Sequence, residues 1–204
     1  MIVIVDYGMG NLASILNMLK RIGARAAISA RPQDIAAAAG LILPGVGAFD
    51  EGMRALEEKG LLPVLNDAVL EQKKPVLGIC LGMQLLTEKS EEGALPGLGW
   101  IAGETIRFRF GPEHRALKIP HMGWNTVEPT RADGLFRDLA EPAFYFVHSY
   151  HVICREAADV LAWCGHGYKF AAAVQRGHVM GTQFHPEKSH KYGLKLLTNF
   201  AELI

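Results

Sequence analysis

The stretch PVLGICLGMQLL, residues 75–86, joins a short apolar run, a cysteine flanked by glycines, and a second apolar segment. A short, continuous apolar run is typical of a strand that is buried on both faces. We therefore predict a strand over residues 75–79 and a sharp turn at Cys80. A helix is predicted directly after the turn, over residues 81–89.

The same alternation of strand and helix signals runs through the rest of the N-terminal half. Apolar runs predict further strands over residues 2–5, 26–29 and 41–43. Asn11 is placed to cap a helix after the first of these strands, and Pro32 to open another after the second. Strands that alternate with helices predict a parallel sheet with helices on both faces.

The C-terminal half has a different pattern, in which strand signals follow one another. Arg176 and Gly177 predict a hairpin turn between the last two strands, and a final helix is expected from about Ser189. We therefore expect one α/β domain over residues 1–204, with a mostly parallel central sheet, helices on both faces and additional antiparallel strands. The predicted strands of this half cover residues 105–108, 143–147, 151–154, 160–164, 170–174 and 179–184.

The composition excludes several classes of function. Lysine plus arginine and aspartate plus glutamate number 21 each, so no net charge favours binding to nucleic acid or an anionic membrane. No apolar stretch approaches the roughly 20 residues of a membrane helix, and the start, MIVIVDYG, lacks the features of a secretory signal. Three cysteines without clustered spacing argue against disulfides and zinc. We expect a cytoplasmic protein without metal or cofactor.

Cys80 has two interpretations. Residues 78–82, GICLG, have the G-x-nucleophile-x-G form of a tight strand-to-helix turn. A helix that begins at Leu81 would favour the thiolate, and the Leu81 N–H could donate to an oxyanion. Free cysteine is also among the most buried residue types, so this motif alone supports a nucleophile and a structural thiol about equally.

A nucleophilic cysteine needs a base and a group that orients the base. The stretch GTQFHPEKS, residues 181–189, supplies His185 and Glu187. Pro186 disfavours helical backbone at the histidine, and in an extended chain residues two apart point to the same side. Alone, this pattern would be a strand-end turn with a solvated glutamate; together with Cys80, it favours a base with its orienting carboxylate.

The stretch PGVG, residues 44–47, is the candidate for a second oxyanion donor. It follows the third predicted strand and should therefore lie at the same sheet edge as Cys80. Its glycines allow a backbone N–H to approach a ligand closely, although an ordinary turn is the alternative. A metal pair at His148 and His151 is rejected because no further ligands lie nearby. The remaining histidines, His114, His121, His166, His178 and His190, are expected at the surface or in loops.

Together these motifs resemble the class I, triad-type glutamine amidotransferases, whose fold is flavodoxin-like. GICLGMQLL is similar to the nucleophile segment of that family and FHPEKS to its His-x-Glu segment, and the resemblance spans nearly the whole chain. More narrowly, DYGMGN, LPGVGAF, PHMGWN and FVHSYH resemble the glutaminase subunits of imidazole glycerol phosphate synthase in histidine biosynthesis. The resemblance implies a triad of Cys80, His185 and Glu187.

The resemblance also implies roles for residues that local patterns leave unassigned, and a heterodimer with a (β/α)₈-barrel cyclase. The alternatives are a glutaminase subunit of an anthranilate or aminodeoxychorismate type of synthase, a cysteine peptidase, or a regulatory subunit with an idle site. Implied oxyanion donors are Leu81, Val46 and Gly47; the implied glutamine pocket is Gly45, Gly47, Gln84, Glu92, His148, Ser149 and Tyr150; the implied partner surface is Asn11, Pro120, Met122, Trp124 and Lys188.

Overall fold

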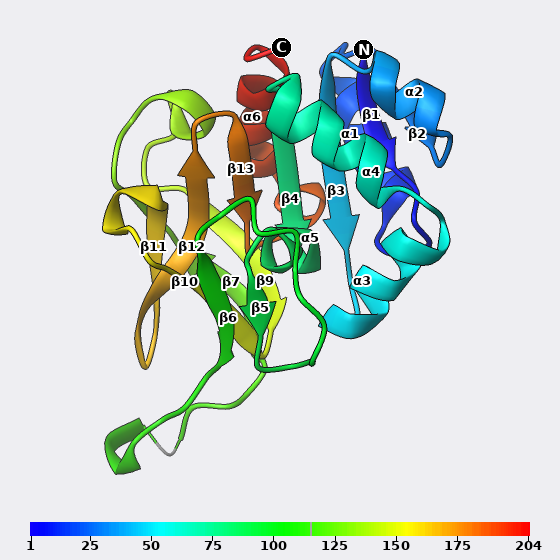
Figure 1. Cartoon of the computed structure of the whole chain (residues 1–204). Coiled ribbons are helices and arrows are strands. Elements are labelled where there is room, and N and C mark those ends of the chain that lie inside the picture. Colours follow the sequence, from blue (N-terminus) through cyan, green and yellow to red (C-terminus); the bar gives the residue numbers. More distant parts are fainter. Residues whose placement is uncertain (115) are drawn as a thin grey trace.

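The computed structural model describes residues 1–114 and 116–204. In its N-terminal half strands and helices alternate along the chain, as the sequence predicts (Figure 1). The elements are β1 (Ile2–Val5), α1 (Leu12–Arg21), β2 (Ala26–Ser29), α2 (Pro32–Ala37), β3 (Gly40–Gly45), α3 (Phe49–Glu58), α4 (Leu62–Asn66), the π-helical turn η1 (Asp67–Glu71), β4 (Val76–Cys80) and α5 (Leu81–Leu85).

The C-terminal half consists mainly of strands, joined by loops and short 3-10 turns, and ends in one helix. The elements are β5 (Lys89–Ser90), β6 (Gly103–Arg107), η2 (Pro112–His114), β7 (His121–Thr126), β8 (Glu128–Pro129), η3 (Gly134–Phe136), β9 (Ala143–His148), β10 (Tyr150–Cys154), η4 (Ala157–Asp159), β11 (Val160–His166), β12 (Tyr168–Arg176), β13 (Val179–Thr182), η5 (Pro186–Lys188) and α6 (His190–Ala201).

The central sheet is parallel through its N-terminal part and then changes direction. Its strand order is β2-β1-β3-β4-β13-β12-β10-β6-β5, and β4 is parallel to both β3 and β13. β13 is antiparallel to β12, and antiparallel pairing continues through β10 and β6. β7 and β9 form a separate antiparallel pair. The predicted α/β class, with added antiparallel strands in the C-terminal half, is confirmed.

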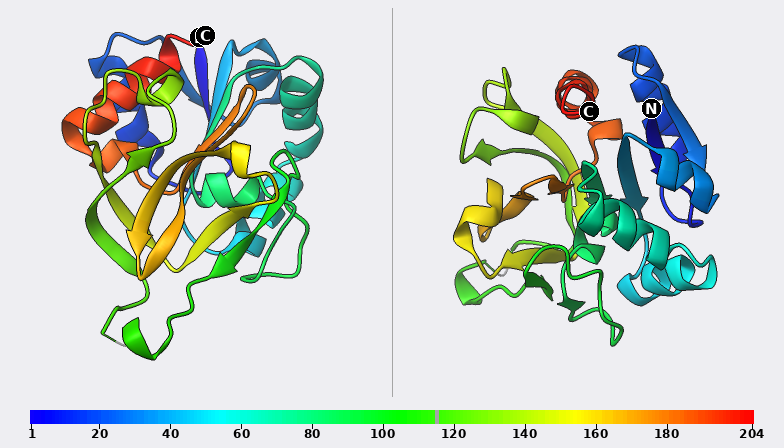
Figure 2. Two further views of the ribbon diagram at one scale, coloured as in Figure 1. Left: turned by 90° about the vertical axis from the view of Figure 1, so that its left-hand side faces the viewer. Right: turned by 45° about the horizontal axis from the view of Figure 1, so that its top comes forward.

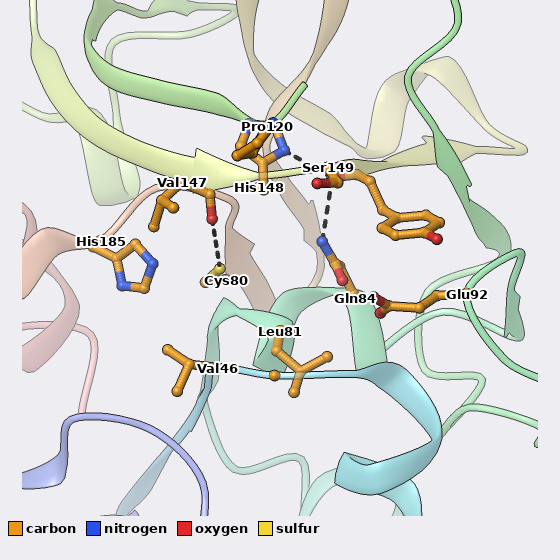
Figure 3. A pocket seen from close by; sticks show the side chains of 12 residues that line it. Val46, Cys80, Leu81, Gln84, Glu92, Pro120, Val147, His148, Ser149 and His185 are labelled. Carbon is orange, nitrogen blue, oxygen red and sulfur yellow. Dashed lines mark hydrogen bonds between the residues drawn. The ribbon is translucent and has the colours of Figure 1, made fainter. Parts of the chain in front are cut away.

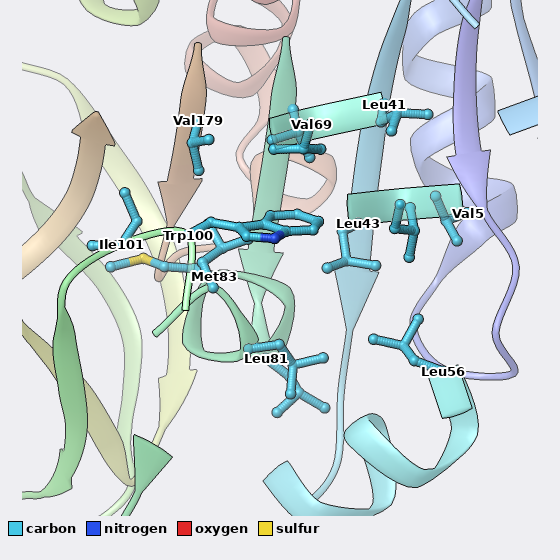
Figure 4. Close-up of a cluster of buried hydrophobic side chains, with 14 of the residues drawn as sticks. Val5, Leu41, Leu43, Leu56, Val69, Leu81, Met83, Trp100, Ile101 and Val179 are labelled. Atoms are coloured by element: carbon cyan, nitrogen blue, oxygen red, sulfur yellow. The ribbon is translucent and has the colours of Figure 1, made fainter. Parts of the chain in front are cut away.

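Helices cover both faces of the parallel part (Figure 2), with α1 and α6 on one face and α3, α4 and α5 on the other. Successive side chains of a strand point to opposite faces, so β1 contributes to two cores. Val3 and Val5 pack in a buried cluster with Leu56 of α3 (Figure 4), whereas Ile2 and Ile4 belong to the cluster of α1 and α6. Burial of each such side chain contributes roughly 1.5–3 kcal/mol to folding.

Two differences from the predicted elements bear on the site. The helix predicted over residues 81–89 ends at Leu85. The chain folds back there, and the backbone N–H groups of Leu98 and Ile101 donate to the carbonyls of Leu85 and Leu86. Lys89 then lies in β5. β7 was not predicted, since its apolar Met122 and Trp124 occupy exposed positions and hide the strand pattern.

Among the described residues, no helix has both the length and the apolar character needed to cross a lipid bilayer.

Candidate active site

Cys80 lies at the junction of β4 and α5 in a strained backbone conformation. Its φ is +54°, a value uncommon for a residue with a side chain, and strain of this kind concentrates at functional sites. The turn is possible because its neighbours lack side chains. A Cβ on Gly82 would lie 1.8 Å from the carbonyl oxygen of Leu43, and a Cβ on Gly78 2.6 Å from that of Gly82. The predicted tight turn is confirmed.

His185 and Glu187 form a buried pair directly after β13. His185 Nδ1 lies 2.8 Å from Glu187 Oε1, with side-chain exposures of 1% and 2%. The backbone between these two residues differs from the extended chain that the sequence predicts. Only His185 is extended, and Pro186 begins the 3-10 turn η5. The turn brings Glu187 back beneath the imidazole, so the carboxylate fixes the ring orientation.

The second ring nitrogen of His185 is available to the thiol. His185 Nε2 is buried and has no hydrogen-bond partner among the residues described, and His185 and Cys80 line the same cavity (Figure 3). Burial alone would lower the His185 pKa, but interaction with Cys80 and Glu187 outweighs it and raises the pKa from 6.5 to about 9. The environment therefore favours an imidazolium next to the sulfur.

The loop after β3 lies next to Cys80 and lines the same cavity. The parallel register pairs Gly45 with Cys80, which brings Val46 and Gly47 to the cavity wall. The Tyr7 hydroxyl donates to the Pro44 carbonyl and holds the base of the loop, and burial raises the Tyr7 pKa. Gly45 itself is buried beneath the loop, and a Cβ there would lie 2.6 Å from the Tyr7 oxygen.

The cavity in front of Cys80 has a volume of about 320 Å³, within the range of small-molecule sites. Gln84 projects from α5 into its wall and donates to the Tyr150 carbonyl at 3.2 Å. Glu92 lies beside Gln84 at the cavity wall (Figure 3) and is half-buried; burial raises its pKa, although it accepts a hydrogen bond from the Phe49 N–H. The residues that line the cavity are Val46, Gly47, Cys80, Leu81, Gln84, Glu92, Pro120, Val147, His148, Ser149, Tyr150 and His185.

A cluster of neutral histidines lies behind the cavity. His148 Nδ1 lies 2.7 Å from the Tyr150 carbonyl and His148 Nε2 lies 3.0 Å from His121 Nδ1. Burial lowers the pKa of both rings, that of His121 to about 4. Since the carbonyl can only accept, His148 carries its proton on Nδ1 and accepts from His121 through Nε2. The prediction of a surface or loop role for His121 is wrong, because the unpredicted strand β7 carries it inward.

The residues expected to meet a partner are exposed, although two of them lie on β7, outside the central sheet. Met122 is 62% and Trp124 49% exposed on β7, and Trp124 stacks on His190 with ring centroids 5.5 Å apart. Asn11, Pro120 and Lys188 are also exposed, although Asn11 additionally caps α1 by accepting from the Ser14 N–H.

Gln183 is a buried neighbour of Cys80 that the sequence analysis did not single out. Its Nε2 lies 3.8 Å from Cys80 Sγ, and its Oε1 accepts from Gln84 Nε2 at 3.1 Å. The side chain is fully buried, two residues before His185. That spacing, within a stretch already of interest, was the signal available in the sequence.

The chain is similar to known proteins over nearly its whole length. The family described as "Glutamine amidotransferase class-I" matches residues 3–203. The chain is 52% identical to imidazole glycerol phosphate synthase subunit HisH 2 of Pseudomonas aeruginosa and 47% identical to subunit HisH of Leptospira interrogans, each over 100% of both chains. A solved glutamine amidotransferase superposes with a TM-score of 0.72 at 22% identity, covering 98% of this chain and 97% of that one, and so shares its fold.

Proposed function

This chain belongs to the class I glutamine amidotransferases, and from that premise we propose that it is the glutamine-hydrolysing subunit of an imidazole glycerol phosphate synthase in histidine biosynthesis. The observation that supports this most strongly is the buried pair of His185 and Glu187 facing Cys80 at its strained turn. A thiol, an imidazole and an orienting carboxylate are the groups that acyl transfer requires.

In the proposed reaction, the Cys80 thiolate attacks the side-chain amide carbon of glutamine. The backbone N–H of Leu81 and an N–H of the Val46–Gly47 loop stabilise the oxyanion. The His185 imidazolium gives its proton to the amide nitrogen, the carbon–nitrogen bond breaks, and ammonia leaves a γ-glutamyl thioester on the sulfur. Neutral His185 then takes a proton from water, which attacks the thioester and releases glutamate.

The substrate itself is held by the rest of the cavity. Glu92 is the carboxylate of the cavity wall and lies across from His148 and Ser149 (Figure 3), and an ammonium group of glutamine would pair with it. Gln84 uses its amide nitrogen on protein acceptors, so its carbonyl oxygen remains for the substrate. The ends of an amino acid can thus be fixed while its side chain reaches Cys80.

We further propose a heterodimer with a (β/α)₈-barrel cyclase that seats on the exposed face of β7 and its surroundings. Ammonia released into water near neutral pH is mostly protonated and no longer nucleophilic, so a synthase gains from direct transfer. Exposed Met122 and Trp124 are the large apolar side chains that such an interface uses as anchors. A cytoplasmic location fits this function, because a reducing environment keeps Cys80 free.

The test combines two measurements on the purified chain. Cys80→Ser should abolish glutamine hydrolysis, and near-normal turnover in that variant would end the proposal. The unmodified chain is then assayed with and without the barrel subunit and its nucleotide ligand. We expect little glutamate release alone and much more in the complex, in step with imidazole formation; equal rates would refute the coupling.

A further inference from the structure

The side-chain amide of Gln183 occupies a place in the site that the reaction as described does not use. It is fully buried, and it touches both the nucleophile and Gln84. A buried primary amide has two donors and one acceptor, and its orientation decides which of them meets the sulfur. That orientation follows from the surrounding hydrogen bonds.

The chain of bonds starts at a group whose polarity is fixed. The Tyr150 carbonyl is held by β10, which pairs with β6, and it can only accept. It already accepts from His148 Nδ1 at 2.7 Å, and Gln84 lies 3.2 Å away with a group that must therefore be its NH₂. The same NH₂ lies 3.1 Å from Gln183, which must present its carbonyl oxygen.

The remaining end of Gln183 is then its NH₂ group, 3.8 Å from Cys80 Sγ. On another side, the Val147 carbonyl lies 4.0 Å from the same sulfur, where it accepts from the thiol but repels a thiolate. The Gln183 NH₂ group is thus placed where it stabilises the thiolate and offsets the repulsion from the Val147 carbonyl. Hydrogen bonds to a charged acceptor are stronger than those to a neutral one.

We propose that Gln183 is a positioning residue for the nucleophile. The Tyr150 carbonyl orients the amide of Gln84, Gln84 orients the amide of Gln183, and the NH₂ group of Gln183 then donates to the Cys80 thiolate. The proposal rests on the proposed function of Cys80 as the nucleophile. Gln183 does not touch glutamine in this role. It fixes the sulfur and sets the orientation of Gln84, which does face the cavity.

The experiment measures the rate at which iodoacetamide alkylates Cys80 in the full-length chain between pH 5 and 10, the range over which thiols ionise. Peptide mass spectrometry resolves Cys80 from Cys154 and Cys164, whose pKa values burial raises to about 12. Gln183→Met removes the donor and keeps an unbranched side chain. We expect roughly tenfold slower alkylation of Cys80 at pH 7, with the profile moved to higher pH.

Gln183→Glu provides the second variant, because its side chain has nearly the shape of glutamine. The test therefore stands even where Gln183→Met does not fold. Gln183→Glu keeps an acceptor for Gln84 but turns an oxygen toward the sulfur, so alkylation should slow further. Thr182→Ser is the matched control, since the Thr182 hydroxyl donates to the Phe184 carbonyl and stands outside the chain of bonds. Its profile should equal that of the unmodified chain.

A natural profile in folded Gln183→Glu, or in folded Gln183→Met, would overturn the positioning role. Alkylation reads the sulfur without requiring glutamine turnover, so the two proposals fail differently. If the profile shifts but the unmodified chain with its barrel partner does not hydrolyse glutamine, the function is refuted and the contact between Gln183 and Cys80 stands.

Discussion

Replacement of Glu187 by glutamine removes one charge and leaves the size of the side chain almost unchanged. Glu187 Oε1 lies 2.8 Å from His185 Nδ1, and both side chains are excluded from water. An unscreened hydrogen bond to a charged group contributes about 1.5–3 kcal/mol, which corresponds to roughly a 10- to 150-fold change in rate.

The side-chain amide introduced by Glu187→Gln adds a second effect to the loss of charge. It can donate to Nδ1 and so leave the ring proton on Nε2, the nitrogen that has to take the proton of the Cys80 thiol. The two effects act in the same direction. We therefore expect Glu187→Gln to lower glutamine hydrolysis by about 100-fold or more.

The assay is the initial rate of glutamate release with the barrel subunit present, together with the thermal unfolding midpoint of each variant. Glu57→Gln is the matched control, because it makes the same change on the exposed side of α3. A folded Glu187→Gln chain that hydrolyses glutamine within about threefold of the unmodified rate would refute the role assigned to the carboxylate, because the loss of one such bond should lower the rate further.

Three further outcomes are expected. Folding raises the His185 pKa from 6.5 to about 9, so the stability that protonation provides is complete below pH 6.5 and is lost as pH rises through 9; urea unfolding should show this decline, and a slope unaltered by Glu187→Gln would contradict it. Tyr7→Phe removes the donor to the Pro44 carbonyl and should cost about 1 kcal/mol of unfolding free energy, whereas an unchanged value would show that the bond contributes nothing. Gly82→Ala would place its Cβ 1.8 Å from the Leu43 carbonyl oxygen, so we expect little folded protein, and a natural melting temperature would disprove that packing.

Sequence patterns predicted the parallel half of the sheet well because β1, β3 and β4 are continuous buried runs, and the partly buried β2 is also an uninterrupted run of small and apolar residues up to Ser29. The ranges 2–5 and 26–29 coincide with β1 and β2, and the turn at Cys80 follows from its flanking glycines. The short helix α5 was predicted too long, since nothing local shows that residues 97–101 return to cap it. Tertiary contacts decide such boundaries.

The buried polar network was beyond prediction for a related reason. His121 contacts His148 across the pairing of β7 with β9, and Gln183 contacts Gln84 across 99 residues. Neither contact has a characteristic spacing in the sequence. The grouping of Cys80 with His185 and Glu187 was predictable only because the glycine-flanked cysteine and the His-Pro-Glu stretch are each distinctive.

The register of three adjacent strands determines whether the site exists. β3 pairs with β4 so that Gly45 lies beside Cys80, and β13 pairs with β4 so that Thr182 lies beside Ile79. The loops that follow therefore emerge at one level, with His185 three residues beyond Thr182. A slip of one residue in β13 would move this segment by about 3.3 Å and reverse the faces of its side chains. The buried apolar side chains on both faces of these strands oppose such a slip, so core packing maintains the alignment of His185 with Cys80.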